Sequence, residues 1–210
     1  MHASRSRLLT GAIAISALTL ASGLAIASTS AQRTSTSAVT AASSDYVIDA
    51  VHSTIIFRIK HMDASYSYGR FNKIDGVANY DASGGLTGLK INVDVDSVDT
   101  ANSARDEHLR NPDFFNTKQF PKATFKSTGV KKAGDHTYDV TGEFTLMGVT
   151  KTITVALEHT GNGKSMQGAD LAGFEGTFTL KRSDFGITKY LPTAIGDDVR
   201  LTISLETIKQ

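Results

Sequence analysis

The 210-residue sequence contains no cysteine, no tryptophan and only three prolines. Without cysteine the chain has no disulfide and no thiolate nucleophile, and it cannot bind zinc or an iron–sulfur cluster through sulfur. A folded domain in this chain therefore relies on its hydrophobic core rather than on covalent cross-links. The scarcity of proline beside 18 glycines suits a chain with many tight turns, which is typical of β structure.

The sequence also lacks a cluster of charge of one sign. It has 22 Lys and Arg against 21 Asp and Glu. Three of the arginines precede residue 45, where there is no acid, so residues 45–210 carry 22 − 3 = 19 basic and 21 acidic side chains, a net charge of −2. Binding to nucleic acid needs clustered Lys and Arg that neutralise phosphates. The charge pattern therefore excludes nucleic acid from the expected partners.

The first residues have the pattern of a secretory signal peptide. Arg5 and Arg7 precede an uncharged stretch that ends in Ala-Ile-Ala at residues 25–27. We expect residues 1–27 to be a signal peptide that exports the protein to the periplasm or the cell exterior. Cleavage after Ala31, or retention of the leader as a membrane anchor, remains open because about 20 apolar residues can span a bilayer.

Residues 28–44 are nearly all Ser, Thr and Ala and show no apolar periodicity. Such a segment cannot bury enough apolar surface to offset the entropy of ordering, so it predicts a disordered linker. The remaining residues, 45–210, have the length of one domain with a sizeable core.

Alternation of apolar and polar residues predicts about eight β-strands in this domain. In residues 54–60, for example, Ile55, Phe57 and Ile59 point to one face of a strand. The regular runs lie at 54–60, 89–96, 152–157 and 199–206, and the less regular ones at 67–80, 122–130, 136–146 and 172–182. Turn residues such as those at 81–85 separate the runs. The pattern predicts an antiparallel sandwich or a closed barrel, and periodicity does not choose between them.

One short helix is expected at about 101–111, within an insertion that ends near residue 115. Asn102 or Ser103 can cap its first turn, and Pro112 follows its last residue.

The histidines and carboxylates show no pattern of a metal site or a catalytic centre. No two histidines have the spacing that places both on one face of a helix or strand. Asp94, Asp96 and Asp99 lie on or beside a wet strand face, where carboxylates solvate the sheet. There is no Gly-x-Ser-x-Gly elbow for a serine nucleophile. We therefore expect a protein that is not an enzyme and that holds no metal and no cofactor.

Phenylalanines are distributed over six of the predicted strands on their apolar faces: Phe57, Phe71, Phe125, Phe144, Phe174 and Phe178. A closed barrel of about eight strands either fills its interior with side chains or holds one small ligand. An interior lined by such residues would select an apolar guest.

Five ordered segments resemble the YceI-like family of exported bacterial lipocalin-like, polyisoprenoid-binding proteins. They read IDAVHSTIIFRIKHM (48–62), HLRNPDFFNTKQFPKATFKST (108–128), GEFTLMGVTKTITV (142–155), FTLKRSDFGI (178–187) and IGDDVRLTISLE (195–206). The resemblance implies an all-β fold, an eight-stranded antiparallel lipocalin-like barrel. It also implies an isoprenoid quinone or polyprenyl lipid in the channel, transient contact with a membrane and, in many members, a homodimer.

The resemblance and the inward strand positions together give the expected ligand-binding residues: Phe57, Ile59, Phe71, Ile91, Val93, Phe114, Phe115, Phe125, Phe144, Val155, Phe174, Phe178, Leu201 and Ile203. The polar residues of the same motifs are the candidate head-group contacts: His52, His61, His108 and Arg182.

Two other functions remain open from the sequence. The same histidines beside Arg182 would serve a barrel isomerase or hydrolase as acid–base groups. A barrel packed solid with side chains would instead be an interaction protein that acts through its surface.

Overall fold

A computed structural model of the chain describes residues 44–210, and the expected signal peptide and most of the linker lie outside the described residues. Ser44, assigned above to the linker, is the first residue of a strand. The strands are β1 Ser44–Ile48, β2 Thr54–His61, β3 Ser65–Phe71, β4 Ile74–Tyr80, β5 Leu86–Asp94, β6 Val98–Asp99, β7 Lys122–Lys132, β8 Thr137–Leu146, β9 Val149–Lys164, β10 Asp170–Lys181 and β11 Ile195–Lys209. The helices are α1 Ser103–Arg110 and the 3-10 turns η1 Val95–Ser97 and η2 Arg182–Phe185.

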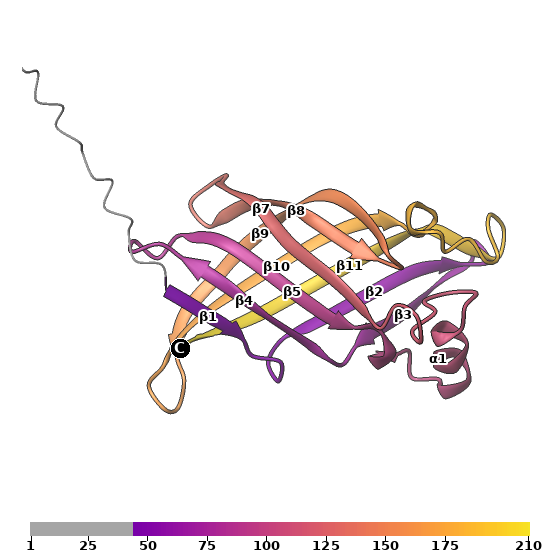
Figure 1. Ribbon diagram of the computed structural model, residues 1–210, viewed down its shortest axis with the longest axis horizontal. Helices are drawn as coiled ribbons and strands as arrows, with labels where there is room; N and C mark the ends of the chain where they lie inside the picture. Colours follow the sequence, from indigo (N-terminus) through magenta and orange to yellow (C-terminus); the bar gives the residue numbers. More distant parts are fainter. Residues whose placement is uncertain (1–43) are drawn as a thin grey trace, which may run out of the picture. The chain divides into compact units, whose positions relative to one another are not determined.

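These strands form one closed antiparallel barrel with eight strands around its wall (Figure 1). Three wall strands consist of two pieces each, because β1 continues as β2, β3 as β4, and β5 as β6. The pieces keep the same neighbours: β1 pairs with β4 as β2 pairs with β3, and both β1 and β2 pair with β11. The expectation of a closed barrel is thus confirmed, and closure removes most of the free strand edges that a sandwich would expose.

The run at 67–80, expected as one strand, is interrupted at Asn72 and Lys73. The interruption lies beside two others, at residues 49–53 and 95–97, in the neighbouring wall strands. Two hydrogen bonds to Ser97 replace the missing strand pairing there: the Lys73 amide donates to its side-chain Oγ over 3.0 Å, and the Asn72 amide donates to its carbonyl over 3.2 Å. The break is therefore a hydrogen-bonded feature of the barrel wall, and the alternation of apolar and polar residues does not predict it.

The helix α1 forms where the sequence predicts it. Asn102 is its N-cap, and its side-chain oxygen accepts from the Arg105 amide over 3.0 Å. Asn111 ends the helix immediately before Pro112. Within residues 44–210 no helix is long and apolar enough to cross a membrane.

The two ends of the barrel differ. At one end lie α1, the β2–β3 turn and the segment between η2 and β11, on the right in Figure 1. At the other end, aromatic rings fill the interior: Tyr80 and Tyr138 each pack on Phe174, with 6.2 Å between ring centroids. We call the first end the mouth and the second the floor.

Candidate functional site: an apolar cavity in the barrel

Between floor and mouth the barrel holds a cavity of about 480 Å³. Its wall is almost wholly apolar and comes from β2, β3, β5, β7 to β11, α1 and the segment after it, and η2. Several of these side chains, including Ile59, Phe144 and Ile153, are only half-buried although they point inward. They border the cavity, so a barrel filled solid with side chains does not describe this interior.

Glycines on the inner face set how closely the wall side chains approach neighbouring strands. A Cβ added at Gly142 would lie 2.6 Å from Phe125 Cζ, and one at Gly176 would lie 2.7 Å from Leu157 Cδ2. Real Cβ atoms do not come so close. The Phe125 ring and the Leu157 side chain therefore lie against the backbone of the adjacent strand only because that strand has glycine at positions 142 and 176. The glycines thereby leave free volume in the middle of the barrel.

The floor is closed by a buried hydrogen-bonded pair. Tyr80 Oη lies 3.1 Å from Thr207 Oγ1, which in turn donates to the Ala172 carbonyl over 2.9 Å. Burial raises the pKa of Tyr80 to about 12, so its phenol stays neutral at physiological pH. A guest in the cavity therefore meets an uncharged, satisfied floor.

The mouth is where the polar residues of the cavity lie. His61, Tyr68, Arg105 and Tyr190 line the cavity and are also exposed at the surface, so the cavity opens at this end. The ring of His108 packs edge-on against Phe114, with 5.0 Å between centroids.

Two further contacts order the rim of the mouth. The ring centroids of His108 and Tyr190 lie 6.3 Å apart, so the histidine connects α1 to the segment before β11. Lys189 Nζ lies 3.0 Å from an Asp113 carboxylate oxygen and so joins the segment after α1 to the segment before β11. The head of a guest would therefore meet exposed imidazole, tyrosine and guanidinium groups at this end.

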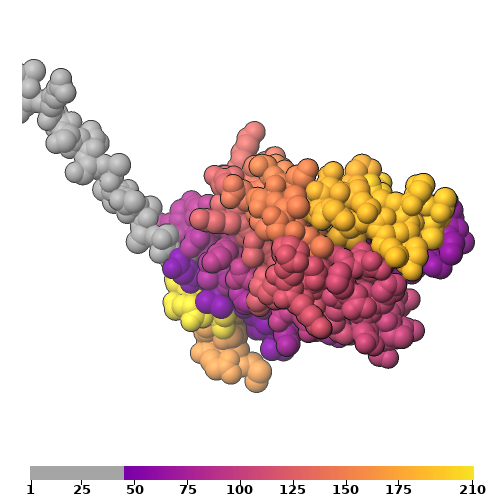
Figure 2. Space-filling model, turned by 45° about the vertical axis from the view of Figure 1, so that its right-hand side comes forward, coloured from indigo at the N-terminus to yellow at the C-terminus, as the bar shows by residue number. Residues whose placement is uncertain are grey.

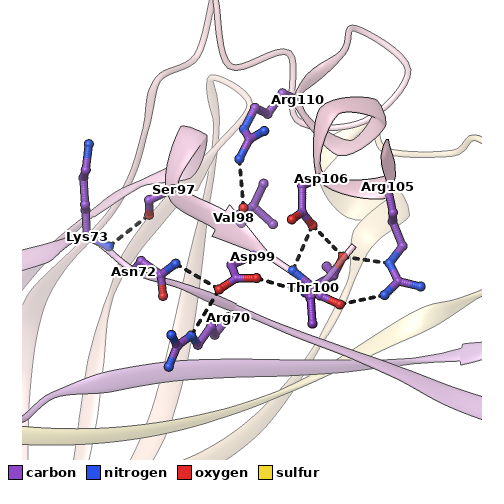
Figure 3. Close-up of polar contacts among 11 residues, drawn as sticks. Arg70, Asn72, Lys73, Ser97, Val98, Asp99, Thr100, Arg105, Asp106 and Arg110 are labelled. Carbon is purple, nitrogen blue, oxygen red and sulfur yellow. Dashed lines mark hydrogen bonds and ion pairs between the residues drawn. The ribbon is translucent and has the colours of Figure 1, made fainter. Parts of the chain in front are cut away.

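A network of polar contacts holds α1 over the mouth (Figure 3). Asp106 Oδ1 accepts from the amide and the hydroxyl of Thr100, over 2.8 and 2.5 Å. The Arg105 guanidinium donates to the hydroxyl and the carbonyl of the same threonine, each over 2.7 Å. Arg110 donates to the carbonyls of Asp96 and Val98 over 2.8 and 3.0 Å. The helix is thus fixed to the segment 96–100, which contains β6, by charge-assisted hydrogen bonds rather than by a broad apolar face.

The structure brings nearly all the expected ligand-binding residues to the cavity wall. Of those named above, only Phe174 is not part of the lining. Phe174 faces inward but belongs to the floor, packed on Tyr80, Tyr138 and His159. The cavity also has lining residues that the sequence reasoning did not single out, among them Leu109, Phe185, Ile187 and Tyr190. Phe185 and Ile187 lie inside one of the quoted motif segments, whereas no signal in the sequence marks Tyr190.

The four candidate head-group residues separate into three groups. His61 and His108 lie at the mouth and line the cavity. Arg182 also lines it, but its guanidinium donates to the carbonyls of Gly196, Ile187 and Ile195 over 2.8 to 2.9 Å. Burial lowers the pKa of Arg182 from its ordinary value. The arginine therefore ties η2 to Ile187 and to the first two residues of β11, and most of its donors are not available to a ligand.

His52 lies away from the cavity, in the loop between β1 and β2. Its Nδ1 is 2.8 Å from Asp49 Oδ2 and 3.7 Å from Glu206 Oε1. The hydrogen bond to Asp49 raises the pKa of His52, and the same bond lowers the pKa of Asp49. Among residues 44–210 this is the group of side chains whose donor atoms lie close enough, within 4.8 Å of one another, to hold a metal ion. Its hydrogen bonds already explain the arrangement.

A closed eight-stranded antiparallel barrel with an apolar cavity open at one end defines the lipocalin-like class of proteins. The model of the YceI-like domain matches residues 46–207, and the chain belongs to this family. A "UPF0312 protein" of Azotobacter vinelandii is 43% identical over 173 residues, which cover 81% of this chain and 90% of the relative. "Protein YceI" of Escherichia coli O157:H7 is 42% identical over 178 residues, which cover 83% of this chain and 92% of the relative.

Solved structures have the same fold. BcnA of Burkholderia cenocepacia superposes with a TM-score of 0.68 at 26% identity, covering 76% of this chain and 98% of its own. A polyisoprenoid binding domain from Saccharophagus degradans, implicated in plant cell wall breakdown, gives a TM-score of 0.62 at 18% identity, covering 79% of this chain and 98% of its own. At that identity the second likeness bears on the fold alone.

Proposed function

We propose that this protein binds an isoprenoid lipid, such as an isoprenoid quinone or a polyprenyl lipid, with the apolar chain inside the barrel and the head group at the mouth. Its role would be to carry, store or sequester the lipid. The observation that carries the proposal is the hollow interior, whose apolar wall is continuous from a closed floor to an open mouth. The polyisoprenoid-binding domain with the same fold adds support.

The energetics favour a long apolar guest over a small polar one. Each CH₂ group transferred from water into such a wall contributes about 0.8 kcal/mol. A five-carbon isoprene unit therefore contributes up to about 4 kcal/mol, reduced by the entropy lost on ordering a flexible chain. The floor offers no free charged group, so the guest has nothing polar to bind at depth.

The arrangement of polar groups favours binding over catalysis. The enzyme hypothesis needs histidines beside Arg182, yet His52 lies in the β1–β2 loop outside the cavity lining. The Arg182 guanidinium is occupied by main-chain carbonyls. The candidate acid–base groups therefore do not form one centre, and we propose no reaction for this cavity.

Titration with prenyl compounds of increasing length, kept below the concentration at which they aggregate, tests the proposal. Affinity is expected to rise with each added isoprene unit and then to reach a plateau when the chain outgrows the cavity. It should change little between low and high salt, because the contacts are apolar and salt screens only charges. An affinity that is indifferent to chain length would overturn the proposal, and native mass spectrometry of the purified protein should reveal a co-purified lipid.

We further propose that the protein acts after export, in the periplasm or outside the cell. The proposal rests on the pattern of residues 1–27, with two arginines before a long uncharged stretch. The intact mass of protein from the periplasmic or secreted fraction should correspond to a chain that begins at Ser28 or Gln32. Recovery of the full-length chain from membranes alone would contradict it.

A further inference from the structure

The outer face of the barrel beside the mouth carries a group of cations that no carboxylate neutralises. Arg58 and Lys60 of β2 and Arg200 of β11 point outward, and none of the three has an acidic oxygen within 4.0 Å in the described part of the chain. Arg58 and Arg200 are directly opposite each other in the β2–β11 register. Like charges in that position destabilise a sheet. The pair therefore does not stabilise the sheet.

Aromatic side chains accompany these cations. The Arg58 guanidinium carbon lies 4.3 Å from the centre of the Tyr66 ring, and Lys60 Nζ lies 4.8 Å from it. In the β2–β3 register Tyr68 is opposite Arg58, and Tyr66 is opposite Lys60. Both rings are about half exposed, at 47% for Tyr66 and 55% for Tyr68. The stacking holds the cations at the surface instead of letting them range through solvent.

This surface is continuous with the opening of the cavity. Lys60 and Tyr68 themselves line the cavity at its mouth. The β2–β3 turn next to them presents Met62, which is 60% exposed, and the Met62 amide donates to the Ala194 carbonyl over 2.8 Å. In Figure 2 the purple residues at the right-hand edge lie beside the yellow segment that precedes and begins β11. We call Arg58, Lys60, Met62, Tyr66, Tyr68 and Arg200 the cationic patch.

We propose that the cationic patch docks the barrel on an anionic lipid bilayer, with the mouth toward the membrane. Fixed positive charge attracts anionic lipid head groups, tyrosines favour the interface between head groups and water, and an exposed methionine at the tip can enter its apolar side. Residues 45–210 as a whole have a net charge of −2. The exposed Lys126 and Lys131 of β7 lie opposite Glu143 and Asp139 of β8, whereas no acid lies opposite Arg58 or Arg200 in the strands that pair with them. The one acid of the turn, Asp63, adjoins Met62 at the tip. The inference deepens the proposed function by naming the surface from which the lipid is taken.

Co-sedimentation with vesicles tests the docking. The protein is expected to bind vesicles of phosphatidylcholine that contain phosphatidylglycerol, to bind pure phosphatidylcholine vesicles much less, and to be released at about 1 M salt, where the Debye length falls to about 3 Å. The triple variant Arg58→Gln, Lys60→Gln, Arg200→Gln should bind the anionic vesicles roughly a hundredfold more weakly, since each basic residue near such a surface contributes about fivefold. Circular dichroism should show both proteins folded.

A matched variant on the other side of the barrel serves as control. Lys90→Gln, Lys126→Gln, Lys131→Gln removes the same charge from exposed positions of β5 and β7, where no aromatic ring stacks on a lysine. It should bind anionic vesicles nearly as well as the unmodified protein. Equal binding by the patch variant, or an equal loss in the control, would overturn the inference.

Two readouts separate this inference from the proposed function. Ile153→Trp adds bulk to the cavity wall and should weaken binding of a prenyl compound but leave vesicle binding unchanged. The double variant Arg58→Gln, Arg200→Gln, at two positions that do not line the cavity, should weaken vesicle binding and leave the binding of a monomeric prenyl compound in free solution unchanged. A protein that binds anionic vesicles but no prenyl chain of any length would contradict the proposed function and leave the docking inference intact.

Discussion

Phe57 of β2 lies directly opposite Gly69 of β3, and its ring occupies the space where a side chain at 69 would begin. A Cβ at Gly69 would overlap that ring and would lie 2.8 Å from Thr100 Cγ2. The glycine thus lets one phenylalanine cover two strands at the mouth half of the cavity.

Gly69→Ala should therefore displace the Phe57 ring and destabilise the domain by about 1 to 3 kcal/mol, as overpacking of a fitted site does. Binding of a prenyl compound should weaken as well, because the displaced ring occupies cavity volume. Gly129→Ala is the control, since nothing lies within 4 Å of a Cβ at that position. Urea unfolding of both variants measures the difference, and equal stabilities would show that the Phe57 ring moves aside without cost.

The two faces of β9 should respond oppositely to a lysine. Val155 is buried and lines the cavity, so Val155→Lys places an unpaired ammonium in apolar surroundings and should cost at least about 2 kcal/mol of folding stability or empty the cavity. Ala156 is exposed and opposite Asp139 of β8, so Ala156→Lys should change stability by under about 0.5 kcal/mol. Thermal or urea unfolding distinguishes the two, and equal tolerance would contradict the assignment of faces.

Arg182 should matter to stability more than its neighbour. Arg182→Lys keeps the positive charge but cannot supply donors to three separate carbonyls, so it should lower the free energy of unfolding by about 2 kcal/mol or more. Lys181→Met removes an exposed ion pair with Asp198 and should cost under about 1 kcal/mol. If Arg182→Lys unfolds like the unmodified protein but binds prenyl compounds poorly, the arginine contacts the head group after all.

The Asp49–His52 pair should make the folding stability of the domain depend on pH. Its hydrogen bond raises the pKa of His52 above the ordinary 6.5, so the stability that the charged imidazole supplies is fully present below pH 6.5 and is lost as the pH rises through the raised value. The pKa of Asp49 is lowered below 3.8. The stability that the ionised Asp49 contributes is therefore present above pH 3.8 and is lost as the pH falls through the lowered pKa.

NMR titration of the imidazole carbons checks this pair. The pKa of His52 should lie above 6.5 in the unmodified protein and fall toward that value in Asp49→Asn. Glu206, whose charge also raises the pKa of His52, remains in that variant, so Asp49→Asn with Glu206→Gln should lower the pKa further. A His52 that titrates at its ordinary pKa before any substitution would show that the hydrogen bond is not formed in solution.

The part of the barrel that could be predicted is the part that depends on the alternation of apolar and polar residues along each strand. The inward residues of 89–95, 153–157 and 199–205 follow from it directly, because a strand with one buried face repeats every second residue. Alternation gives the face but not the height along the barrel. Phe174 and Phe178 share a face of β10, yet Phe174 lies in the floor and Phe178 lines the cavity.

The polar part of the site was less predictable for a different reason. The partners of Arg182 are the main-chain carbonyls of Ile187 and of the first two residues of β11, which come together only in the folded chain, and side-chain identity does not encode them. His52 and His61 stand at the two ends of one stretch of sequence, but the interruption before β2 places His52 outside the cavity lining.

The interruptions in three adjoining wall strands also have a mechanical consequence. In the part of the chain that the structure describes, β6 pairs only with β3, and no strand pairs with residues 65–69 of β3 on the side away from β2. The strands β2, β3 and β6 thus form a part of the sheet that pairs with the rest of the barrel along β11, whereas β1, β4 and β5 complete a full cylinder around the floor. The hydrogen bonds of α1 to Thr100, Asp96 and Val98 hold that part of the sheet in place.

This part of the wall opens sideways more readily than a complete cylinder. Its opening breaks the hydrogen bonds of α1 but no row of hydrogen bonds between strands. Backbone amides of β3 should exchange with deuterium faster than those of β4, and Asp106→Asn should widen that gap. A chain too long for the interior would then have a lateral exit through the wall as well as an axial one.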